Sequence, residues 1–418
     1  MFKFVHCADL HLDSPLRGLS NKEDAPEDQI RSATRKALLN LVDLCIEEGV
    51  NFLVIAGDVY DGEWQDYSTG LFFNSCMAKL SDRDIPVYLI SGNHDAASNI
   101  SRRLVLPQNV IQFSVDAPET YVIDDLGVAL HGQGFKHREV RENLALSYPP
   151  AVPGYFNIGV LHTSADGREG HETYAPCRVE DLVEKGYDYW ALGHIHKREV
   201  LHENPYVLFS GNLQGRHIRE TGEKGCTLVT VDGGRVTLEH RPVDVLRWHE
   251  CLVDLSDAHT DDDFTSLVSE AMDDVTAKNA GYPLALRIRL VGTTQLHGRL
   301  REDMEKYHNE VRNAAAMVAQ DLIWIEKVKF DTRPWANRSQ EVGGDALAHL
   351  LKSIDAAAKD PDFLNQFFAQ MKSVQQKLGS YIKSMDATRL NSVEDVLSLL
   401  DDAKEILITR STDGRLGE

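Results

Sequence analysis

Short apolar runs alternate with amphipathic segments along residues 1–240, and the two patterns predict alternating strands and helices. The runs that predict strands lie at residues 2–7, 51–56, 86–90, 155–161 and 187–192. Residues 31–48 and 68–80 repeat apolar side chains at helical spacing, and Gly49 follows the first of these segments as a typical helix-ending residue. Strands and helices that alternate in this way predict an α/β fold with parallel strands.

A second unit follows at residues 245–332 and has a β-α-β-α-β pattern of its own. We predict strands at residues 248–255, 284–291 and 322–330, and helices at residues 262–278 and 301–320. In the middle strand, apolar residues alternate with Arg287 and Arg289. Because successive side chains of a strand point to opposite faces, one face is buried and the other bears the two arginines.

Residues 336–418 form an acidic tail with helical periodicity. Its apolar stripes are Leu347, Leu350, Leu351 and Ile354, and then Phe363, Phe367, Met371, Val374 and Leu378. Two interpretations of this tail stay open: a helix set that lays its Phe367–Met371 stripe into a partner, or a structural extension packed on the second unit. The three segments predict domains at residues 1–244, 245–335 and 336–418.

Composition restricts the classes of function. The chain has 418 residues, 42% of them apolar, so it can bury a full core. Its formal net charge is −21, and an acidic surface repels phosphate backbones, which argues against a generic nucleic-acid binder. A nuclease stays compatible with this charge, because bound divalent cations add positive charge where the substrate binds.

The cysteines and the hydropathy pattern indicate the compartment. Six scattered cysteines without a CxxC pair predict buried reduced thiols rather than disulfides or a zinc cluster. The chain has no run of about 18 apolar residues, so we expect no membrane span. The short apolar stretch before Asp9 is no signal peptide. We therefore expect a soluble cytoplasmic protein with no membrane association.

Polar clusters follow the predicted strands at their carboxyl ends. They are Asp9-Leu-His11, Gly57-Asp58, Gly92-Asn93-His94-Asp95, Leu161-His162 and Gly193-His194-Ile195-His196. Each cluster alone is a weak signal, since an isolated Gly-Asp is usually a turn and a lone histidine is usually a core residue. Together, in this order and at the sheet edge where α/β proteins build their sites, they predict one shared site.

The side chains of these clusters form a metal-binding set. Seven of them offer oxygen or nitrogen ligands: Asp9, His11, Asp58, Asn93, His162, His194 and His196. Seven ligands suffice for two metal ions bridged by one carboxylate, a site that hydrolyses phosphate esters through an activated water. An Asn oxygen is a ligand for hard metals, and the histidine beside it, His94, can act as an acid.

In these five clusters the chain resembles the calcineurin-like metallophosphoesterases, and more closely the SbcD-type bacterial DNA-repair exonucleases of the YhaO-like kind. The resemblance covers residues 1–335 by organisation and includes the segments 210–220 and 222–226. It implies an α/β fold: a calcineurin-like phosphoesterase β-sandwich flanked by helices, a smaller α/β capping domain and a helical C-terminal tail.

The resemblance also implies roles for the site residues. One metal would be held by Asp9, His11, Asp58 and His196, and the other by Asp58, Asn93, His162 and His194. Asp58 would bridge the two, His94 would meet the phosphate and protonate or stabilise the leaving oxygen, and Asp61 would orient His94. A mixed carboxylate, imidazole and amide set suits Mn²⁺ or another first-row ion better than Mg²⁺. We therefore expect two divalent ions, with Mn²⁺ in the active form.

For function, these implications predict a metal-dependent exonuclease or endonuclease acting on DNA in repair. Candidate phosphate contacts are Arg216, Arg219, Arg287, Arg289, Arg299 and Arg301, and the alternative for them is an ordinary solvated basic face. The expected partners are DNA, an SMC-like ATPase of the SbcC type, and a second copy of the chain. Two alternatives stay open: a phosphodiesterase acting on a small phosphoester, and a scaffold subunit of the ATPase complex.

Overall fold

The computed structural model describes residues 1–14, 16, 27–61, 67–97, 105–165, 174–319, 322–335, 345–378 and 392–412. The chain folds into two compact units. The first comprises Met1–Glu250, Asn279–Arg287 and Asp321–Glu326, and the second comprises Cys251–Lys278, Ile288–Gln320 and Lys327–Glu418. The three domain boundaries expected from the sequence stay predictions.

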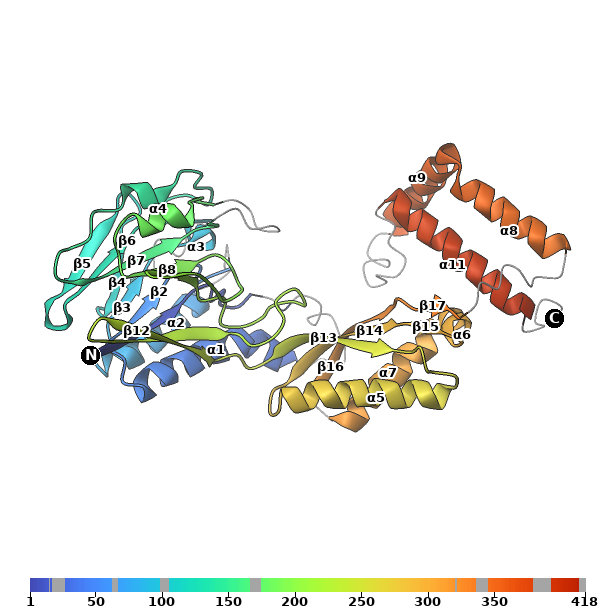
Figure 1. The fold of residues 1–418 in the computed structure, drawn as a ribbon, viewed down its shortest axis with the longest axis horizontal. Helices are drawn as coiled ribbons and strands as arrows, with labels where there is room; N and C mark the ends of the chain where they lie inside the picture. Colours follow the sequence, from blue (N-terminus) through green and yellow to red (C-terminus); the bar gives the residue numbers. More distant parts are fainter. Residues whose placement is uncertain are drawn as a thin grey trace. The chain divides into compact units, whose positions relative to one another are not determined.

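The first unit contains two six-stranded sheets (Figure 1). One has the order β12 (Arg235–Pro242), β11 (Gly225–Asp232), β1 (Phe2–Cys7), β2 (Phe52–Ile55), β3 (Val87–Leu89) and β4 (Val110–Gln112). The other has the order β5 (Glu119–Ile123), β6 (Val128–Gly132), β7 (Phe156–His162), β8 (Tyr189–Gly193), β10 (Tyr206–Phe209) and β9 (Glu199–Glu203). The strands from β1 to β4 run parallel, as do β6, β7, β8 and β10.

The two sheets pack face to face around an aromatic core. Phe4 stacks on Phe52 with ring centroids 4.9 Å apart, and Tyr189 of the other sheet meets Phe4 edge-on at 5.3 Å. Helices α1 (Glu27–Glu47) and α2 (Ser68–Ser81) cover the outer face of the first sheet, and α4 (Val179–Val183) lies against the outer face of the second. The predicted calcineurin-like sandwich flanked by helices is confirmed.

The parallel strands bring the predicted site together. In β1 and β2 the register runs from Phe4 opposite Phe52 to Cys7 opposite Ile55, so both strands end at the same edge. In the other sheet His162 lies opposite Gly193. The polar clusters that follow these strands are therefore neighbours in space, although they are far apart in sequence.

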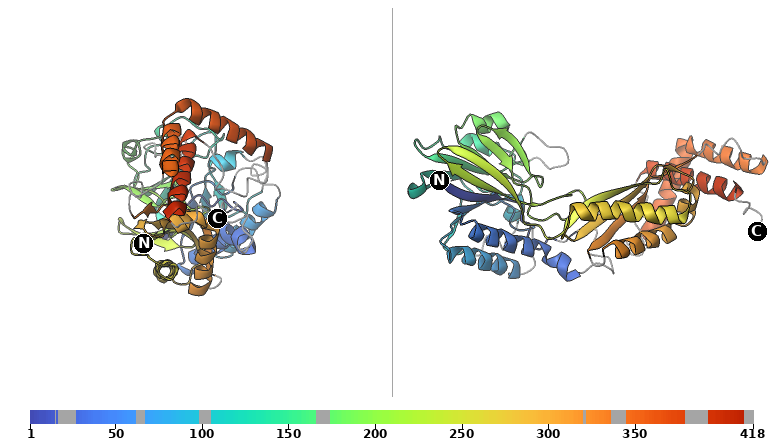
Figure 2. Two further views of the ribbon diagram at one scale, coloured as in Figure 1. Left: turned by 90° about the vertical axis from the view of Figure 1, so that its right-hand side faces the viewer. Right: turned by 60° about the horizontal axis from the view of Figure 1, so that its bottom comes forward.

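A three-stranded sheet of order β13 (Arg247–Asp254), β14 (Leu284–Val291) and β16 (Ile323–Phe330) matches the predicted β-α-β-α-β pattern. Its strands are parallel, since the ends of β13 and β14 meet through the bond from Leu255 N to Val291 O. Helices α5 (Asp261–Lys278) and α7 (Met304–Val318) lie side by side on one face, where Phe264 meets Tyr307 (Figures 1 and 2). The smaller α/β domain is thus confirmed.

The helix expected at residues 301–320 is present as α7, but it begins later than expected, because residues 301 and 302 belong to the separate short helix α6 (His297–Glu302). Asp303 separates the two helices, with a backbone outside the helical region at φ −133° and ψ 66°. Its side chain accepts a hydrogen bond from Lys306 N at 3.0 Å, and so caps the start of α7. The apolar periodicity of the segment does not reveal this cap.

The tail contains α8 (Asp345–Ala358), α9 (Pro361–Leu378) and α11 (Val393–Thr412). Leu364 of α9 and Val396 of α11 form a small core, and Phe367 and Met371 pack against it. Part of the stripe that could bind a partner is therefore covered within the chain itself. Both interpretations of the tail stay predictions.

All six cysteines are buried and carry free thiols, which confirms the prediction of reduced side chains. Among the helices of the described ranges, none combines the length and the apolarity that a membrane crossing requires.

Candidate metal centre

Two loops that follow adjacent strands form the floor of the candidate site. The loop after β1 lies beside the loop after β2, because Asp9 N donates to Gly57 O at 3.0 Å and His11 N donates to Asp58 O at 3.1 Å. A β-bridge between Leu12 and Tyr60 continues this pairing. The parallel pairing thus extends past the strands and fixes the carboxylate of Asp58 beside the polar side chains of the loop after β1.

The backbone of these loops is strained at the predicted ligands. Seven non-glycine residues of the described ranges have a positive φ, and four of them are predicted ligands. These four are Asp9 at 53°, His11 at 43°, Asp58 at 52° and His194 at 100°. Such conformations cost roughly 1–3 kcal/mol each and gather at sites where side chains must be aimed in a particular direction.

Two glycines allow the loops to approach one another. A Cβ on Gly92 would lie 2.2 Å from Asp58 Oδ1 and 2.8 Å from Asp58 N. A Cβ on Gly193 would lie 2.0 Å from the carbonyl oxygen of Ala56. Close packing therefore requires the glycines before Asn93 and His194. This explains why the Gly-Asn-His and Gly-His motifs begin with glycine.

Replacing Gly92 by Ala tests this packing. We expect the new methyl group to push Asp58 away and to lower the free energy of unfolding by about 1–3 kcal/mol, the usual effect of overpacking. Urea denaturation measures the change. Gly186→Ala is the control, because its Cβ meets no atom within 4 Å and its φ of 72° imposes only the left-handed backbone cost. A Gly92→Ala protein as stable as the wild type would contradict the close approach.

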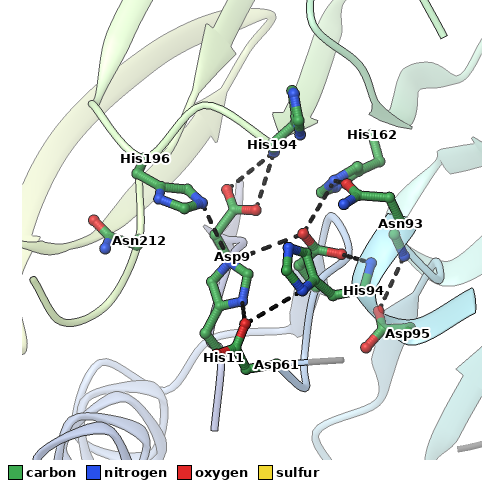
Figure 3. Close-up of polar contacts among 12 residues, drawn as sticks. Asp9, His11, Asp61, Asn93, His94, Asp95, His162, His194, His196 and Asn212 are labelled. Carbon is green, nitrogen blue, oxygen red and sulfur yellow. Dashed lines mark hydrogen bonds and ion pairs between the residues drawn. The ribbon is translucent and has the colours of Figure 1, made fainter. Parts of the chain in front are cut away.

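The side chains converge in three groups of possible ligands. Within each group, one ligand atom from every residue lies within 4.8 Å of the others. The groups are Asp9, His11 and His196; His11, Asp58 and His94; and Asp9, Asp58 and His162. Figure 3 labels Asp9, His11, His94, His162 and His196 of these groups, which gather from loops of both sheets.

Several close contacts join the predicted ligand atoms to one another. His11 Nε2 and His196 Nε2 lie 3.2 Å apart, and His162 Nε2 lies 3.0 Å from Asn93 Oδ1 and 3.4 Å from Asp58 Oδ2. Asp9, His11, Asp58, Asn93 and His162 are each at most 3% exposed. Six of the seven predicted ligands are thus brought together, five of them buried and the sixth, His196, with a side chain that is 18% exposed.

The outward nitrogens of His162 and His196 are held by acceptors. His162 Nδ1 donates to Ala56 O at 2.9 Å, and His196 Nδ1 donates to Glu220 Oε1 at 2.6 Å. His11 Nδ1 faces Asp61 Oδ1 at 3.5 Å. A proton fixed on Nδ1 leaves the Nε2 lone pair directed into the cluster, which is the arrangement that metal-binding histidines use. The residues therefore fit a pair of divalent cations.

The electrostatics of the cluster favour bound cations. Burial and the neighbouring Asp58 raise the pKa of Asp9, although His196 and His162 act in the opposite direction. Burial also opposes the charge on Asp58, but His162 and His11 outweigh it and hold the pKa of Asp58 below its ordinary range. For His162, burial would lower the pKa, yet the Asp58 carboxylate raises it to about 9. Two buried carboxylates this close depend on nearby positive charge.

His194 is placed differently from the other predicted ligands. Its backbone N donates to both carboxylate oxygens of Asp9, at 3.1 and 3.0 Å. Its ring points away from Asp9 in Figure 3 and packs near the rings of His162 and Tyr174, with centroids 5.3 and 5.5 Å apart. None of the three groups found among the described residues includes it. Its role as a ligand stays a prediction.

His94 and Asp61 lie at the open side of the cluster. His94 Nδ1 is 3.2 Å from Asp61 Oδ1, and the side chains are 30% and 21% exposed, against 2% for Asp58. Burial would lower the pKa of His94, but the hydrogen bond to Asp61 and the charge of Asp58 raise it above its ordinary value. The backbone N of His94 also donates to Asp58 Oδ1 at 2.9 Å. His94 is therefore a partly exposed acid beside a sealed cluster.

Two acidic residues of the site are absent from the predicted set. Asp95 accepts hydrogen bonds from the backbone N of Gly92, Val59 and Tyr60 at 3.0–3.3 Å, and so ties two motif loops together. It is the last residue of the Gly-Asn-His-Asp cluster, and this position is the only sequence signal for it. Glu220 binds His196 across 24 residues, and no spacing rule predicts that pair.

The predicted phosphate-contacting arginines fall into different environments. Arg216 lies in the site, with NH1 3.5 Å from Asp61 Oδ1 and NH2 3.4 Å from Glu220 Oε1. Arg287 forms two bonds of 2.7 Å to Glu326, Arg289 pairs with Asp331 at 2.8 Å, and Arg301 donates to Phe330 O. Arg219 and Arg299 are exposed. The arginines of β14 are therefore engaged in ion pairs within the fold.

Adding Mn²⁺ should stabilise the folded chain. At 100 times the dissociation constant, one site contributes about 2.7 kcal/mol, which corresponds to a rise in Tm of roughly 5–10 °C for a domain of this size. Thermal unfolding in chelator and in increasing Mn²⁺ measures this shift. A Tm that is indifferent to the metal would argue against a preformed centre.

Comparisons with known proteins show which families the chain resembles. Residues 2–198 match the family described as Calcineurin-like phosphoesterase, and residues 248–333 match the one described as Metallophosphoesterase YhaO, middle domain. The chain is 36% identical over 294 residues to the Bacillus subtilis (strain 168) protein named Uncharacterized metallophosphoesterase YhaO, covering 69% of this chain and 72% of that protein. A dimetal phosphatase from Danio rerio aligns over 58% of this chain and 96% of its own, with 13% identity and a TM-score of 0.36.

Proposed function

The chain belongs to the calcineurin-like metallophosphoesterases, in their YhaO-like group, and from this premise we propose that the bonds it hydrolyses are phosphodiesters of DNA. The observation that carries the proposal is the partly exposed pair of His94 and Asp61 beside the sealed cluster. An acid placed where solvent and substrate have access, next to a site for two cations, suits the cleavage of an unactivated phosphodiester.

In this proposal the sequence-based ligand sets are retained. Asp9, His11, Asp58 and His196 would hold one ion, and Asp58, Asn93, His162 and His194 would hold the other. The two bound ions would supply a hydroxide nucleophile at neutral pH and would neutralise charge on the phosphoryl oxygens. A shared Asp58 keeps the two sets adjacent, because its oxygens already face His11, His162 and the backbone N of His94.

His94 and Asp61 would act on the leaving group. Asp61 Oδ1 holds His94 Nδ1, which leaves the other ring nitrogen to meet the leaving oxygen. Protonation of that oxygen matters for a DNA substrate, since the leaving sugar alkoxide is strongly basic. Proton transfer of this kind contributes about 10²–10⁴-fold to a rate.

Arg216 would meet the substrate's phosphate from the other side of Asp61. Its guanidinium is 13% exposed and lies between Asp61 and Glu220, within the open side of the site. Arg219 and Arg299 keep exposed side chains and are the stronger candidates for contacts with the DNA backbone beyond the cleaved bond. The ion-paired Arg287 and Arg289 are weaker candidates, because a phosphate would compete with Glu326 and Asp331.

We also retain Mn²⁺ as the expected metal, on the grounds of the mixed donor set. Full activity with Mg²⁺ alone would overturn that expectation. An SMC-like ATPase of the SbcC type and a second copy of the chain stay as proposed partners. A phosphodiesterase acting on a small substrate is the second candidate function, and the net charge of −21 favours it because such a substrate carries fewer phosphates.

A comparison of substrates separates these two functions. The purified chain is assayed in Mn²⁺ with duplex DNA, single-stranded DNA and bis(p-nitrophenyl) phosphate, beside Asp58→Asn as the inactive reference. We expect DNA to be degraded, with a higher kcat/KM than for the diaryl ester. Cleavage of the diaryl ester without cleavage of either DNA would select the small-molecule function.

A further inference from the structure

Glu220 is a buried carboxylate whose two oxygens are both engaged at the site. Oε1 accepts from His196 Nδ1 at 2.6 Å, while Oε2 accepts from Asn212 Nδ2 at 3.0 Å and from the backbone N of Arg216 at 2.7 Å. Only 6% of Glu220 is exposed. Burial opposes its charge, but the hydrogen bond from His196 and the Arg216 guanidinium hold the pKa of Glu220 below its ordinary range.

The segment that carries Glu220 is fixed on both sides. Trp248 Nε1 donates to Gly215 O at 2.9 Å, and Gly222 N donates to Trp248 O at 3.0 Å. Lys224 Nζ donates to the carbonyl oxygen of His196 at 3.0 Å, so the same segment also holds the main chain of the histidine. The carboxylate is therefore placed by a rigid support rather than by a mobile loop.

A second group competes for the same nitrogen of His196. Arg216 NH2 lies 3.2 Å from His196 Nδ1, and a guanidinium can only donate. If Arg216 donated to Nδ1, the single proton of the neutral ring would move to Nε2, the atom that faces His11 Nε2 at 3.2 Å. A ring protonated at Nε2 offers no lone pair to a cation there. The contact of 2.6 Å with Glu220 favours the opposite tautomer.

We propose that Glu220 is a positioning residue that keeps the proton of His196 on Nδ1 and so prepares Nε2 to bind a divalent cation. The inference rests on the metal centre of the proposed function and adds a residue to it. In the absence of Glu220, the adjacent Arg216 would take the Nδ1 lone pair and close the site at this ligand.

The geometry requires glutamate and not its amide. Glutamine has one acceptor oxygen, whereas here both oxygens of Glu220 receive hydrogen bonds. In Glu220→Gln, the amide NH₂ must face either His196 Nδ1 or the donors Asn212 Nδ2 and Arg216 N. Aspartate keeps the charge but is shorter by one methylene group, so it reaches His196 less well.

Mn²⁺ binding to Glu220→Gln tests the proposal. Titration followed by the electron paramagnetic resonance of free Mn²⁺ measures affinity and stoichiometry without any substrate. We expect one of two sites to weaken about 10–100-fold, the usual effect of losing such a support. Activity should recover at high Mn²⁺, with an increased KM for the metal and a kcat within a few-fold of the wild type. A general loss of structure would not give this recovery.

Glu223→Gln is the matched control, because Glu223 lies three residues further on, is 53% exposed at its side chain and pairs with Arg247. It should bind Mn²⁺ as the wild type does. Glu220→Asp is tested in parallel, with a smaller loss expected, and decides the matter if urea denaturation shows that Glu220→Gln does not fold. Wild-type affinity at both sites in the folded Glu220 variants would overturn the proposal. Failure of the wild type to cleave DNA would overturn the proposed function alone, since metal affinity is read independently.

Discussion

Asp58→Asn is expected to lower kcat/KM for phosphodiester hydrolysis at least ~10³-fold, because loss of a charged group at the reacting centre removes stabilisation that the reaction needs. Asp58, like Asp9 and His11, belongs to two of the three ligand groups. One oxygen faces His162 Nε2 at 3.4 Å and His11 Nε2 at 3.8 Å, while the other accepts from His94 N. Asparagine can still accept from His94 N, but it then presents NH₂ to both imidazoles and cannot bridge two cations.

The loss of the bridging carboxylate should be visible in the number of metal ions bound per chain. Elemental analysis after dialysis against limiting Mn²⁺ is expected to give two ions per wild-type chain and fewer than two for Asp58→Asn. The stabilisation by Mn²⁺ should shrink in parallel. Asp84→Asn is the control, since Asp84 is exposed and has a φ of 55°, beside 52° for Asp58. Because the control makes the same change in the same backbone conformation, a difference between the two variants reflects the place of Asp58 in the metal site. Two tightly bound ions in Asp58→Asn would contradict the bridging role.

The sequence predicts much of this centre because its ligands follow strands. A parallel strand that ends in Gly-Asp or Gly-His places those residues at the edge it shares with its neighbours, so proximity follows from topology alone. Asp9, Asp58 and His162 are predicted in this way, and the structure brings them within 4.8 Å of one another. The parallel registers of β1 with β2 and of β7 with β8 explain that success.

Contacts between side chains far apart in sequence are not predictable in this way. The alternation in β14 correctly places Arg287 and Arg289 on the less buried face, but not their partners Glu326 and Asp331, which lie 39 and 42 residues further on. The same limit hides the bond of Glu220 to His196. The direction of the His194 ring also escapes the pattern, since a φ of 100° turns the chain there in a way that alternation does not encode.

His94→Ala is expected to produce the second large effect, a fall in kcat for DNA of about 10²–10⁴-fold, the range found for general acids. Both metal ions should stay bound, because the bond to Asp58 Oδ1 comes from the backbone N of residue 94, which alanine retains. The side chain that is lost is the partly exposed ring held by Asp61, so the damage falls on the reaction rather than on the fold. KM should change little.

The leaving group reveals what His94 does. A sugar alkoxide needs a proton as it departs, whereas p-nitrophenolate is a weak base and leaves without one. The defect of His94→Ala should therefore be large on DNA and small on bis(p-nitrophenyl) phosphate. His137→Ala, at an exposed histidine outside the site, should leave both rates unchanged. An equal loss on the two substrates would mean that His94 binds the phosphate rather than protonating the leaving oxygen. The carboxylate of Asp61 would then serve only to keep a positively charged His94 ring beside the phosphate.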